Sequence, residues 1–294
     1  MEPIPNSKLI IPNSYVVCGP TASGKSDLSD ALAEGLTELH DCHVPTLVVD
    51  SMQVYRELPT ITNQARGRAA ELVGIVSVTE EWSVARHRSR AEEIIAKEAR
   101  FVLDAGTGMY LNALLLDFPL APKVPPGLRR RAEETTVDAL NPRRAARERE
   151  LDLAGADARG SVWQGDLRYD TAVVYLRPDR SELDAAIARR SRKIVRDGLG
   201  EARALNDMLA RGENLSPSVM DSVGVRELTN YLSGTLSIEQ AQEIIAVRTR
   251  RFARRQMRWF DKLTKTLEGR ARITVLRERA DLDTLHSMHD IISS

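Results

Sequence analysis

The stretch of sequence that decides the fold is Tyr15-Val16-Val17-Cys18-Gly19-Pro20-Thr21-Ala22-Ser23-Gly24-Lys25-Ser26. It opens with apolar and aromatic residues typical of a buried strand, and apolar residues at helical spacing follow Ser26. The part from Gly19 to Ser26 fits the motif G-x-x-x-x-G-K-[ST] at every specified position, between the strand and the helix that this motif requires. The stretch therefore predicts a loop that binds phosphate groups.

The physical basis of this prediction is the set of donors that such a loop presents. Glycines let successive backbone N–H groups turn inward, and the start of a helix adds the positive end of its dipole. We expect the phosphate contacts to come from Gly19, Ala22, Ser23, Gly24, Lys25 and Ser26. The ammonium of Lys25 would meet the outermost phosphate, and the hydroxyl of Ser26 would bind Mg²⁺. The motif leaves open whether the phosphates belong to a nucleotide or to an isoprenoid diphosphate.

Strand and helix patterns alternate along the rest of the chain. Further apolar runs lie at 44–49, 100–103, 171–176 and 273–276, and helical patterns lie at 82–97, 181–196, 201–209 and 238–265. We expect capping residues at Ser181 and Asp184 for the helix that begins there, and a capping box of Ser237 and Gln240 for the last helix. The alternation predicts an α/β fold: a P-loop NTPase-like, mainly parallel sheet flanked by helices.

A proline-rich linker at 119–126 separates two regions of different composition. We expect a catalytic core formed by residues 1–120 and 166–294, and a small helical insertion at 121–165. Arginine is frequent at 128–149, where few large apolar residues could anchor the chain. The segment is either a solvated helical hairpin or an arm that lies on a nucleic-acid backbone.

Overall composition excludes several classes of protein. The 294 residues contain 42 basic and 42 acidic side chains, so the whole-chain charge indicates no partner. The two cysteines have no metal-ligand spacing, and no apolar run approaches the roughly 20 residues of a membrane span. With no secretory signal pattern, we expect a cytoplasmic protein without membrane contact, and a monomer.

Four motifs in order give the chain a family resemblance. They are the phosphate loop, Asp50-Ser51-Met52-Gln53-Val54-Tyr55-Arg56, Gly106-Thr107-Gly108-Met109-Tyr110-Leu111, and Thr249-Arg250-Arg251-Phe252-Ala253-Arg254-Arg255-Gln256-Met257-Arg258-Trp259-Phe260. With them the chain resembles the tRNA dimethylallyltransferase family over about residues 15–265. Those enzymes attach an isopentenyl group from dimethylallyl diphosphate to the exocyclic amine of the adenosine beside the anticodon of tRNA. The related adenylate isopentenyltransferases share part of the set.

The resemblance implies roles for individual residues. Thr21 and Asp50 match active-site residues of the family, and Arg190 matches its diphosphate-binding arginine; we count all three as catalytic. Residues implied to contact the acceptor are Ser51, Gln53, Thr62, Gly106, Thr107, Arg255 and Gln256. Asp50 suits a general base or orienting group, because an adenine amine is a poor nucleophile until its proton is accepted. Without the resemblance, Asp50 also reads as a turn or helix-cap residue, and Arg190 as part of a surface ion pair.

The chain also departs from the family pattern. Ala70-Glu71 stands where the family usually has a His pair, Gln64 replaces a lysine, Val225 replaces a tyrosine, and the helical insertion is short. These departures keep open the same transfer to a free adenine nucleotide or another small acceptor. Asp104 follows an apolar run where the family has an apolar residue, which suggests a P-loop kinase or NTPase instead. An RNA-binding descendant without turnover is a fourth possibility.

Overall fold

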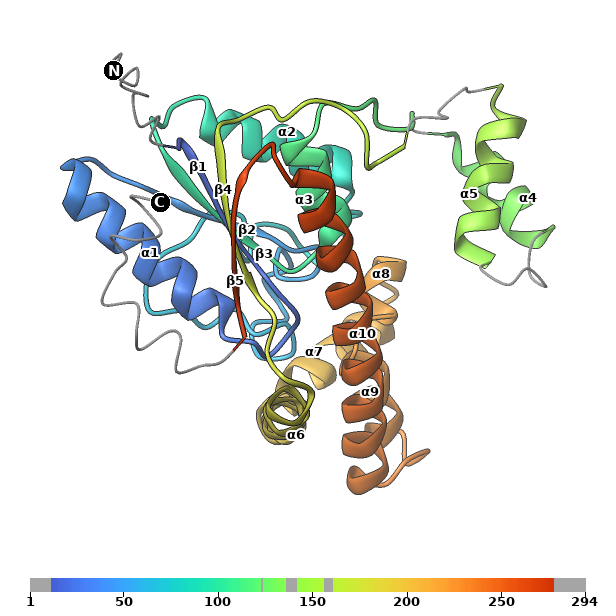
Figure 1. The fold of residues 1–294 in the computed structure, drawn as a ribbon. Coiled ribbons are helices and arrows are strands. Elements are labelled where there is room, and N and C mark those ends of the chain that lie inside the picture. Colours follow the sequence, from blue (N-terminus) through green and yellow to red (C-terminus); the bar gives the residue numbers. More distant parts are fainter. Residues whose placement is uncertain (1–11, 123, 136–141, 156–160, 278–294) are drawn as a thin grey trace, which may run out of the picture. The chain divides into compact units, whose positions relative to one another are not determined.

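The protein is described by a computed structural model that covers residues 12–122, 124–135, 142–155 and 161–277 (Figure 1). The chain divides into a larger unit, Met1–Leu115 with Leu167–Ser294, and a smaller one, Leu116–Asp166. The expected insertion at 121–165 falls within the smaller unit. None of the described helices has the length and apolar composition needed to cross a membrane.

The centre of the larger unit is a parallel sheet with the strand order β2-β3-β1-β4-β5. Its strands are β1 (Ser14–Cys18), β2 (Thr46–Val49), β3 (Phe101–Ala105), β4 (Thr171–Leu176) and β5 (Arg272–Leu276). Every residue of β1 to β4 is buried, which explains why they are nearly continuous apolar runs. Because all strands run the same way, the loops after β1, β2 and β3 meet at one edge of the sheet.

Helix α1 (Lys25–His40) packs on one face of this sheet. Its apolar residues Leu28, Leu32 and Leu36 form a cluster with alternate strand residues such as Tyr15 and Val17. Figure 1 shows α1 on one side of the sheet and α2 (Val84–Ile95), α3 (Gly108–Leu115) and α10 (Ile238–Leu267) on the other. The phosphate loop is thus held between a buried strand and a helix packed on that strand.

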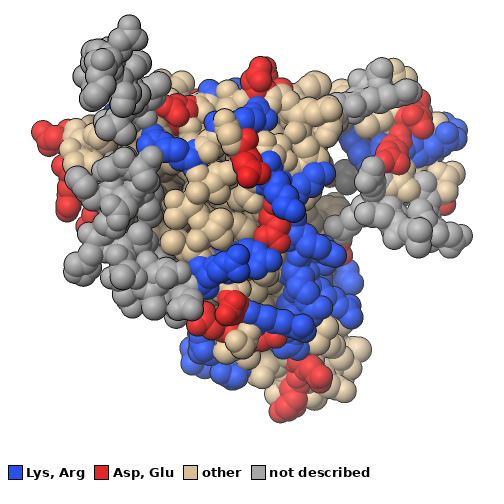
Figure 2. Space-filling model, in the orientation of Figure 1, with Lys and Arg blue, Asp and Glu red and all other residues tan. Residues whose placement is uncertain are grey.

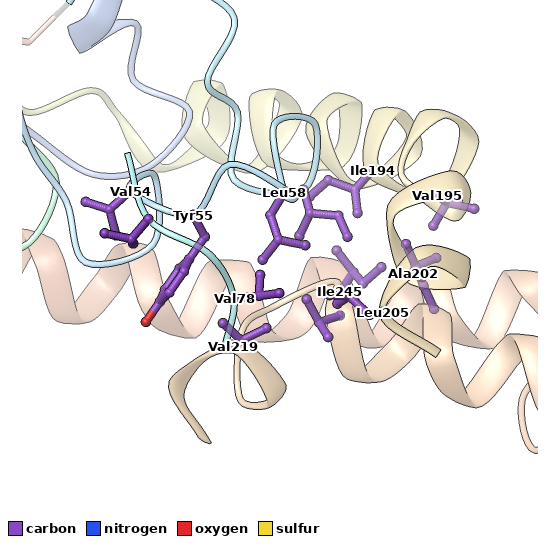
Figure 3. Close-up of a cluster of buried hydrophobic side chains, with 14 residues drawn as sticks. Val54, Tyr55, Leu58, Val78, Ile194, Val195, Ala202, Leu205, Val219 and Ile245 are labelled. Carbon is purple, nitrogen blue, oxygen red and sulfur yellow. The ribbon is translucent and has the colours of Figure 1, made fainter. Parts of the chain in front are cut away.

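A second apolar cluster packs the segment after β2 against helices of the C-terminal half of the chain (Figure 3). The helices are α6 (Arg180–Asp197), α7 (Leu199–Ala210), α8 (Pro217–Met220), α9 (Val225–Leu232) and α10. Tyr55, Leu58 and Ile61 from the segment after β2 pack against them. This cluster fixes a long stretch without regular secondary structure against the helices that bear the basic side chains.

The sequence prediction and the structure agree on the class of fold, and β4 has the predicted bounds. The capping box of Ser237 and Gln240 is confirmed by reciprocal hydrogen bonds of 2.8 and 3.2 Å. The predicted cap at Ser181 and Asp184 is wrong, since the N-cap of α6 is Asp179, without a side-chain hydrogen bond. Helices α3, α8 and α9 were not expected, because each is too short to show a clear helical period.

The smaller unit contains α4 (Pro126–Glu134) and α5 (Pro142–Leu153), which pack against each other. Arg147 pairs with Glu150 at 2.7 Å and donates a second hydrogen bond to the carbonyl of Pro122. Arg131 and Arg149 are exposed. The pairing of Arg147 agrees with the solvated-hairpin interpretation, and the exposed arginines leave the nucleic-acid interpretation open. Asn141 and the side chains of Arg143 and Arg144 lie outside the described residues.

Replacing Ile245 by alanine tests the second apolar cluster. Ile245 is fully buried on α10, so the substitution removes apolar contacts and leaves a cavity. We expect a loss of about 2–5 kcal/mol in the free energy of unfolding, measured by urea denaturation. The matched control is Ile244→Ala on the same helix, where the side chain is 37% exposed. It should change stability by no more than about 0.5 kcal/mol. Equal losses for the two variants would contradict the packing.

Candidate active site

The phosphate loop has the backbone conformation of an anion-binding turn. Gly24, the residue before α1, has φ 88°, and Ala22 has φ 67°, which is left-handed although it is not glycine. A Cβ at Gly19 would lie 2.8 Å from the carbonyl oxygen of Leu176 in the neighbouring strand. Gly19 is thus required by close packing, and Gly24 by its dihedral angles. The strained Ala22 marks this loop as a functional segment.

A cavity of about 580 Å³ opens over this loop. Its wall includes Ala22 to Asp27 and, from other parts of the chain, Gln53, Asn63, Glu182, Arg189, Arg190 and Lys193. Ser23 Oγ and Gln53 Oε1 are buried without a hydrogen-bond partner in the described structure. Buried polar atoms normally have partners, so these two indicate a ligand that supplies them. The balance of charges around the cavity favours an anion.

Asp50 follows β2 and uses its two carboxylate oxygens differently. Oδ1 accepts hydrogen bonds from the backbone N–H groups of Met52 and Gln53, at 2.8 and 3.3 Å. Oδ2 lies 2.6 Å from the point that a Cβ on Gly106 would occupy, and Nζ of Lys25 lies 3.6 Å from the same point. Through Oδ1, Asp50 is therefore a turn residue, as one of its two interpretations predicted. Its Oδ2 faces the end of the phosphate loop. Gly106 leaves room for this approach.

The cationic side of the cavity comes from Lys25 and α6. Burial lowers the pKa of the Arg190 guanidinium, and the nearby charge of Asp50 acts in the opposite direction. Neither Lys25 nor Arg190 forms a salt bridge with a described carboxylate. The surface-ion-pair interpretation of Arg190 is thus wrong within the described residues. Within the part of the chain that the structure describes, both cations are available to an anionic ligand.

Gln256 connects the loops that form the site. Its Oε1 accepts a hydrogen bond from the backbone N–H of Thr21 at 2.8 Å, and its Nε2 donates to the carbonyl of Gly106 at 2.7 Å. The side chain is 5% exposed. The contact of Gln256 with an acceptor stays a prediction, whereas within the protein its amide group holds the phosphate loop to the loop after β3. Thr21 is buried beside it.

Hydroxyl groups of the other predicted residues bond mainly within the protein. Thr107 Oγ1 accepts from the N–H of Ser51 at 3.1 Å, which joins the segments after β2 and β3. Thr62 Oγ1 donates to the carbonyl of Leu58 at 2.6 Å and accepts from Gln64 Nε2 at 3.0 Å. Their roles toward an acceptor remain predictions. Gln64 thus stabilises the turn that carries Thr62.

Arg255 lies on the outer surface of α10, and the cavity over the phosphate loop is not lined by it. Its guanidinium is 5.7 Å from the centre of the Phe252 ring. Exposed arginines of this helix are Arg251, Arg254, Arg255 and Arg258, whereas Arg248 is paired with Glu227. Figure 2 shows Lys and Arg side chains gathered over the region of α10. The structure therefore separates Arg255 from the predicted phosphate contacts and places it on a basic surface.

Ser26 fits the expected role in binding Mg²⁺. Its hydroxyl donates to Asp104 Oδ2 at 2.8 Å, so the lone pairs of its oxygen remain for a cation. Among the described residues no group of three or more His, Cys, Asp or Glu side chains could hold a metal ion. A single serine oxygen at the end of the phosphate loop is compatible with Mg²⁺, because this ion commonly takes few protein ligands and completes its shell with phosphate oxygens and water.

Four residues near the site were not assigned from the sequence. Arg66 and Asp30 form a buried ion pair of 2.7 Å beside the phosphate loop. Arg189 and Lys193 line the cavity with Arg190. Lys193 lies four positions after Arg189 and three after Arg190, and this helical spacing is the sequence pattern that could have identified them as neighbours. No sequence pattern pointed to Arg66, because it lies in a segment without helical or strand periodicity.

Comparison with known proteins identifies the family of the chain. A family model described as IPP transferase matches residues 53–158 and 135–263. A tRNA dimethylallyltransferase of Rubrobacter xylanophilus is 58% identical over 283 residues, covering 95% of this chain and 97% of that protein. A tRNA dimethylallyltransferase 1 of Citrifermentans bemidjiense is 31% identical over 280 residues, covering 84% and 88%.

Solved structures also resemble the chain. The crystal structure of the tRNA isopentenylpyrophosphate transferase of Bacillus halodurans has a TM-score of 0.67 at 25% identity, covering 95% of this chain and 96% of that one. A eukaryotic dimethylallyltransferase, described as acting on tRNA, has a TM-score of 0.70 at 21% identity, covering 95% and 77%; it supports the fold alone. On the sequence matches, the chain belongs to the tRNA dimethylallyltransferase family of IPP transferases.

Proposed function

We propose that this protein transfers a dimethylallyl group from dimethylallyl diphosphate to the exocyclic amine of an adenosine in tRNA, next to the anticodon. The observation that carries the proposal is the position of Asp50. Its Oδ2 faces Gly106 beside the phosphate-loop lysine, at the edge of the sheet where the loops meet. A base for the amine and cations for a diphosphate are thus neighbours in a chain that belongs to this family of transferases.

The reaction requires one bond to form while another breaks. The amine nitrogen attacks C1 of the dimethylallyl group, and the bond from C1 to the diphosphate oxygen breaks with its electron pair. The nitrogen then loses a proton, which Asp50 Oδ2 accepts. Because Oδ1 is held by two backbone N–H groups, the carboxylate is fixed in direction before the acceptor arrives.

Charge builds up on the departing diphosphate and needs fixed donors. Lys25, Arg190 and the loop N–H groups are the candidates in this cavity, and Ser26 would hold Mg²⁺. When bound, Mg²⁺ would neutralise part of the charge on the leaving group. A guanidinium at position 190 suits two phosphate oxygens, because its N–H groups form a planar fork.

A tRNA acceptor explains the basic surface of α10. The exposed arginines there would contact backbone phosphates, while an adenosine turned out of the anticodon loop reaches Asp50. Single-stranded loops allow this most easily, since their bases are already partly unstacked. The surface supports the RNA substrate over a free nucleotide, which would not need it.

The choice of acceptor is tested with labelled dimethylallyl diphosphate and Mg²⁺. We expect label in unmodified tRNA and not in AMP, measured by acid precipitation and chromatography. The control is tRNA that carries guanosine in place of the adenosine next to the anticodon. Label in AMP alone would favour the small-acceptor alternative. Rapid ATP hydrolysis with no diphosphate released from the donor would favour the kinase alternative.

Replacing Asp50 by asparagine tests the general base. The amide oxygen can still accept the N–H groups of Met52 and Gln53, so the turn is preserved while the basic oxygen is lost. We expect kcat for tRNA to fall about 100-fold or more, with the Kd for the donor nearly unchanged. Single-turnover kinetics and equilibrium binding measure the two quantities. Normal turnover would remove Asp50 from the mechanism.

Replacing Arg190 by alanine tests the diphosphate contact. A hydrogen bond to a charged group is worth about 1.5–3 kcal/mol, so donor binding should weaken about 10- to 100-fold, measured by calorimetry. The matched control is Arg192→Ala on the same helix, because Arg192 lines a different cavity. It should bind the donor normally. If Arg190→Ala changed tRNA affinity alone, the assignment of Arg190 would be wrong.

A further inference from the structure

A buried carboxylate lies directly beneath the phosphate loop. Asp104 belongs to the interior strand β3, is 1% exposed, and lies opposite Val17 of β1. A charge inside a sheet costs free energy unless other groups compensate for it. The neighbouring positions of β3 are apolar, so Asp104 is not explained by the strand itself.

One oxygen of Asp104 holds the predicted metal ligand. Ser26 donates its hydroxyl hydrogen to Oδ2 at 2.8 Å. This hydrogen bond fixes the rotation of the hydroxyl group and directs its lone pairs away from the carboxylate. A negatively charged acceptor also makes the Ser26 oxygen a better ligand, as partners of metal ligands do in other sites.

The other oxygen of Asp104 has no partner within the described residues. Oδ1 is buried and accepts no hydrogen bond there, which is unusual for a carboxylate. It is therefore a second, independent sign that a donor reaches this place in the working protein. Water bound to a metal ion is a donor of the right kind.

Arg66 determines the net charge of the cluster that it forms with Asp104 and Asp30. It pairs with Asp104 Oδ2 at 2.5 Å and with Asp30 Oδ1 at 2.7 Å, and its side chain is 5% exposed. The two carboxylates and one guanidinium leave one net negative charge beside Ser26. Because Arg66 shares Oδ2 with Ser26, Asp104 acts on the metal through the serine and not as a direct ligand by that oxygen.

We propose that Asp104 is a positioning residue for Ser26, and that through Ser26 it sets how tightly the phosphate loop holds Mg²⁺ together with diphosphate. The proposal rests on the proposed function, since it assumes that the loop binds diphosphate with Mg²⁺. A purely structural role is the alternative. In that case Asp104 and Asp30 would serve only to anchor Arg66, and with it the segment after β2.

The two roles are separated by comparing Asp104→Asn with Asp30→Asn. Each substitution removes one carboxylate from Arg66, but only the carboxylate of Asp104 accepts a hydrogen bond from the Ser26 hydroxyl. Binding of inorganic diphosphate is measured by calorimetry over a range of Mg²⁺ concentrations and also in EDTA. Thermal unfolding of both variants checks that they remain folded. If Asp104→Asn does not fold, Asp104→Ser takes its place with the same expected shift, because it also removes the carboxylate that accepts from Ser26.

For Asp104→Asn we expect the Mg²⁺ concentration at half-maximal binding to rise about 10- to 100-fold, while binding in EDTA stays the same. For Asp30→Asn we expect the wild-type Mg²⁺ requirement. Equal shifts in the two variants, or no shift in Asp104→Asn, would overturn the positioning role and leave the proposed function intact. If the wild-type protein bound no diphosphate at all, the proposed function would fail, and this inference with it.

Discussion

A single buried carboxamide holds the site together. Gln256 bonds to the backbone N–H of Thr21 on one side and to the carbonyl of Gly106 on the other. The phosphate loop, the loop after β3 and α10 are far apart in sequence, and this side chain fixes the distance between them. These two buried hydrogen bonds contribute more to stability than the same bonds would on the surface, because water does not compete for their donors and acceptors.

The second constraint at this edge of the sheet is steric. A Cβ at Gly106 would overlap Asp50 Oδ2, and one at Gly108 would lie 2.2 Å from the ring of Trp259. Glycine at these positions lets the carboxylate approach the phosphate-loop lysine and lets α3 begin against α10. The motif Gly-Thr-Gly is therefore a packing requirement as much as a chemical one. Tyr110, two positions after this motif, is half-buried, and this burial raises its pKa, with the charge of Asp50 adding to the effect.

Local patterns predicted most of the scaffold but not the links between its parts. The strand before Gly19 and the long helix from Ile238 were evident, because burial on one or both faces leaves a clear period in the sequence. The nearness of Asp50 to the phosphate loop followed from the parallel topology. The roles of Gln256 and Arg66 did not, since a bond between residues distant in sequence has no periodic signature. Arg255 was assigned by resemblance, and its exposed position beside Gln256 depends on the rotation of α10 about its own axis.

That rotation has a consequence for how the sequence can change. Arg255 points outward and Gln256 inward, and one residue advances an α-helix by about 100°. Inserting a single residue just before this pair would turn the guanidinium of Arg255 toward Thr21 and Gly106 and move the carboxamide of Gln256 away from them. Point substitutions on the outer face leave the inner contacts alone, whereas an insertion within the helix rotates every later side chain by about 100° at once. The length of α10 up to this point is thus as constrained as the residues themselves.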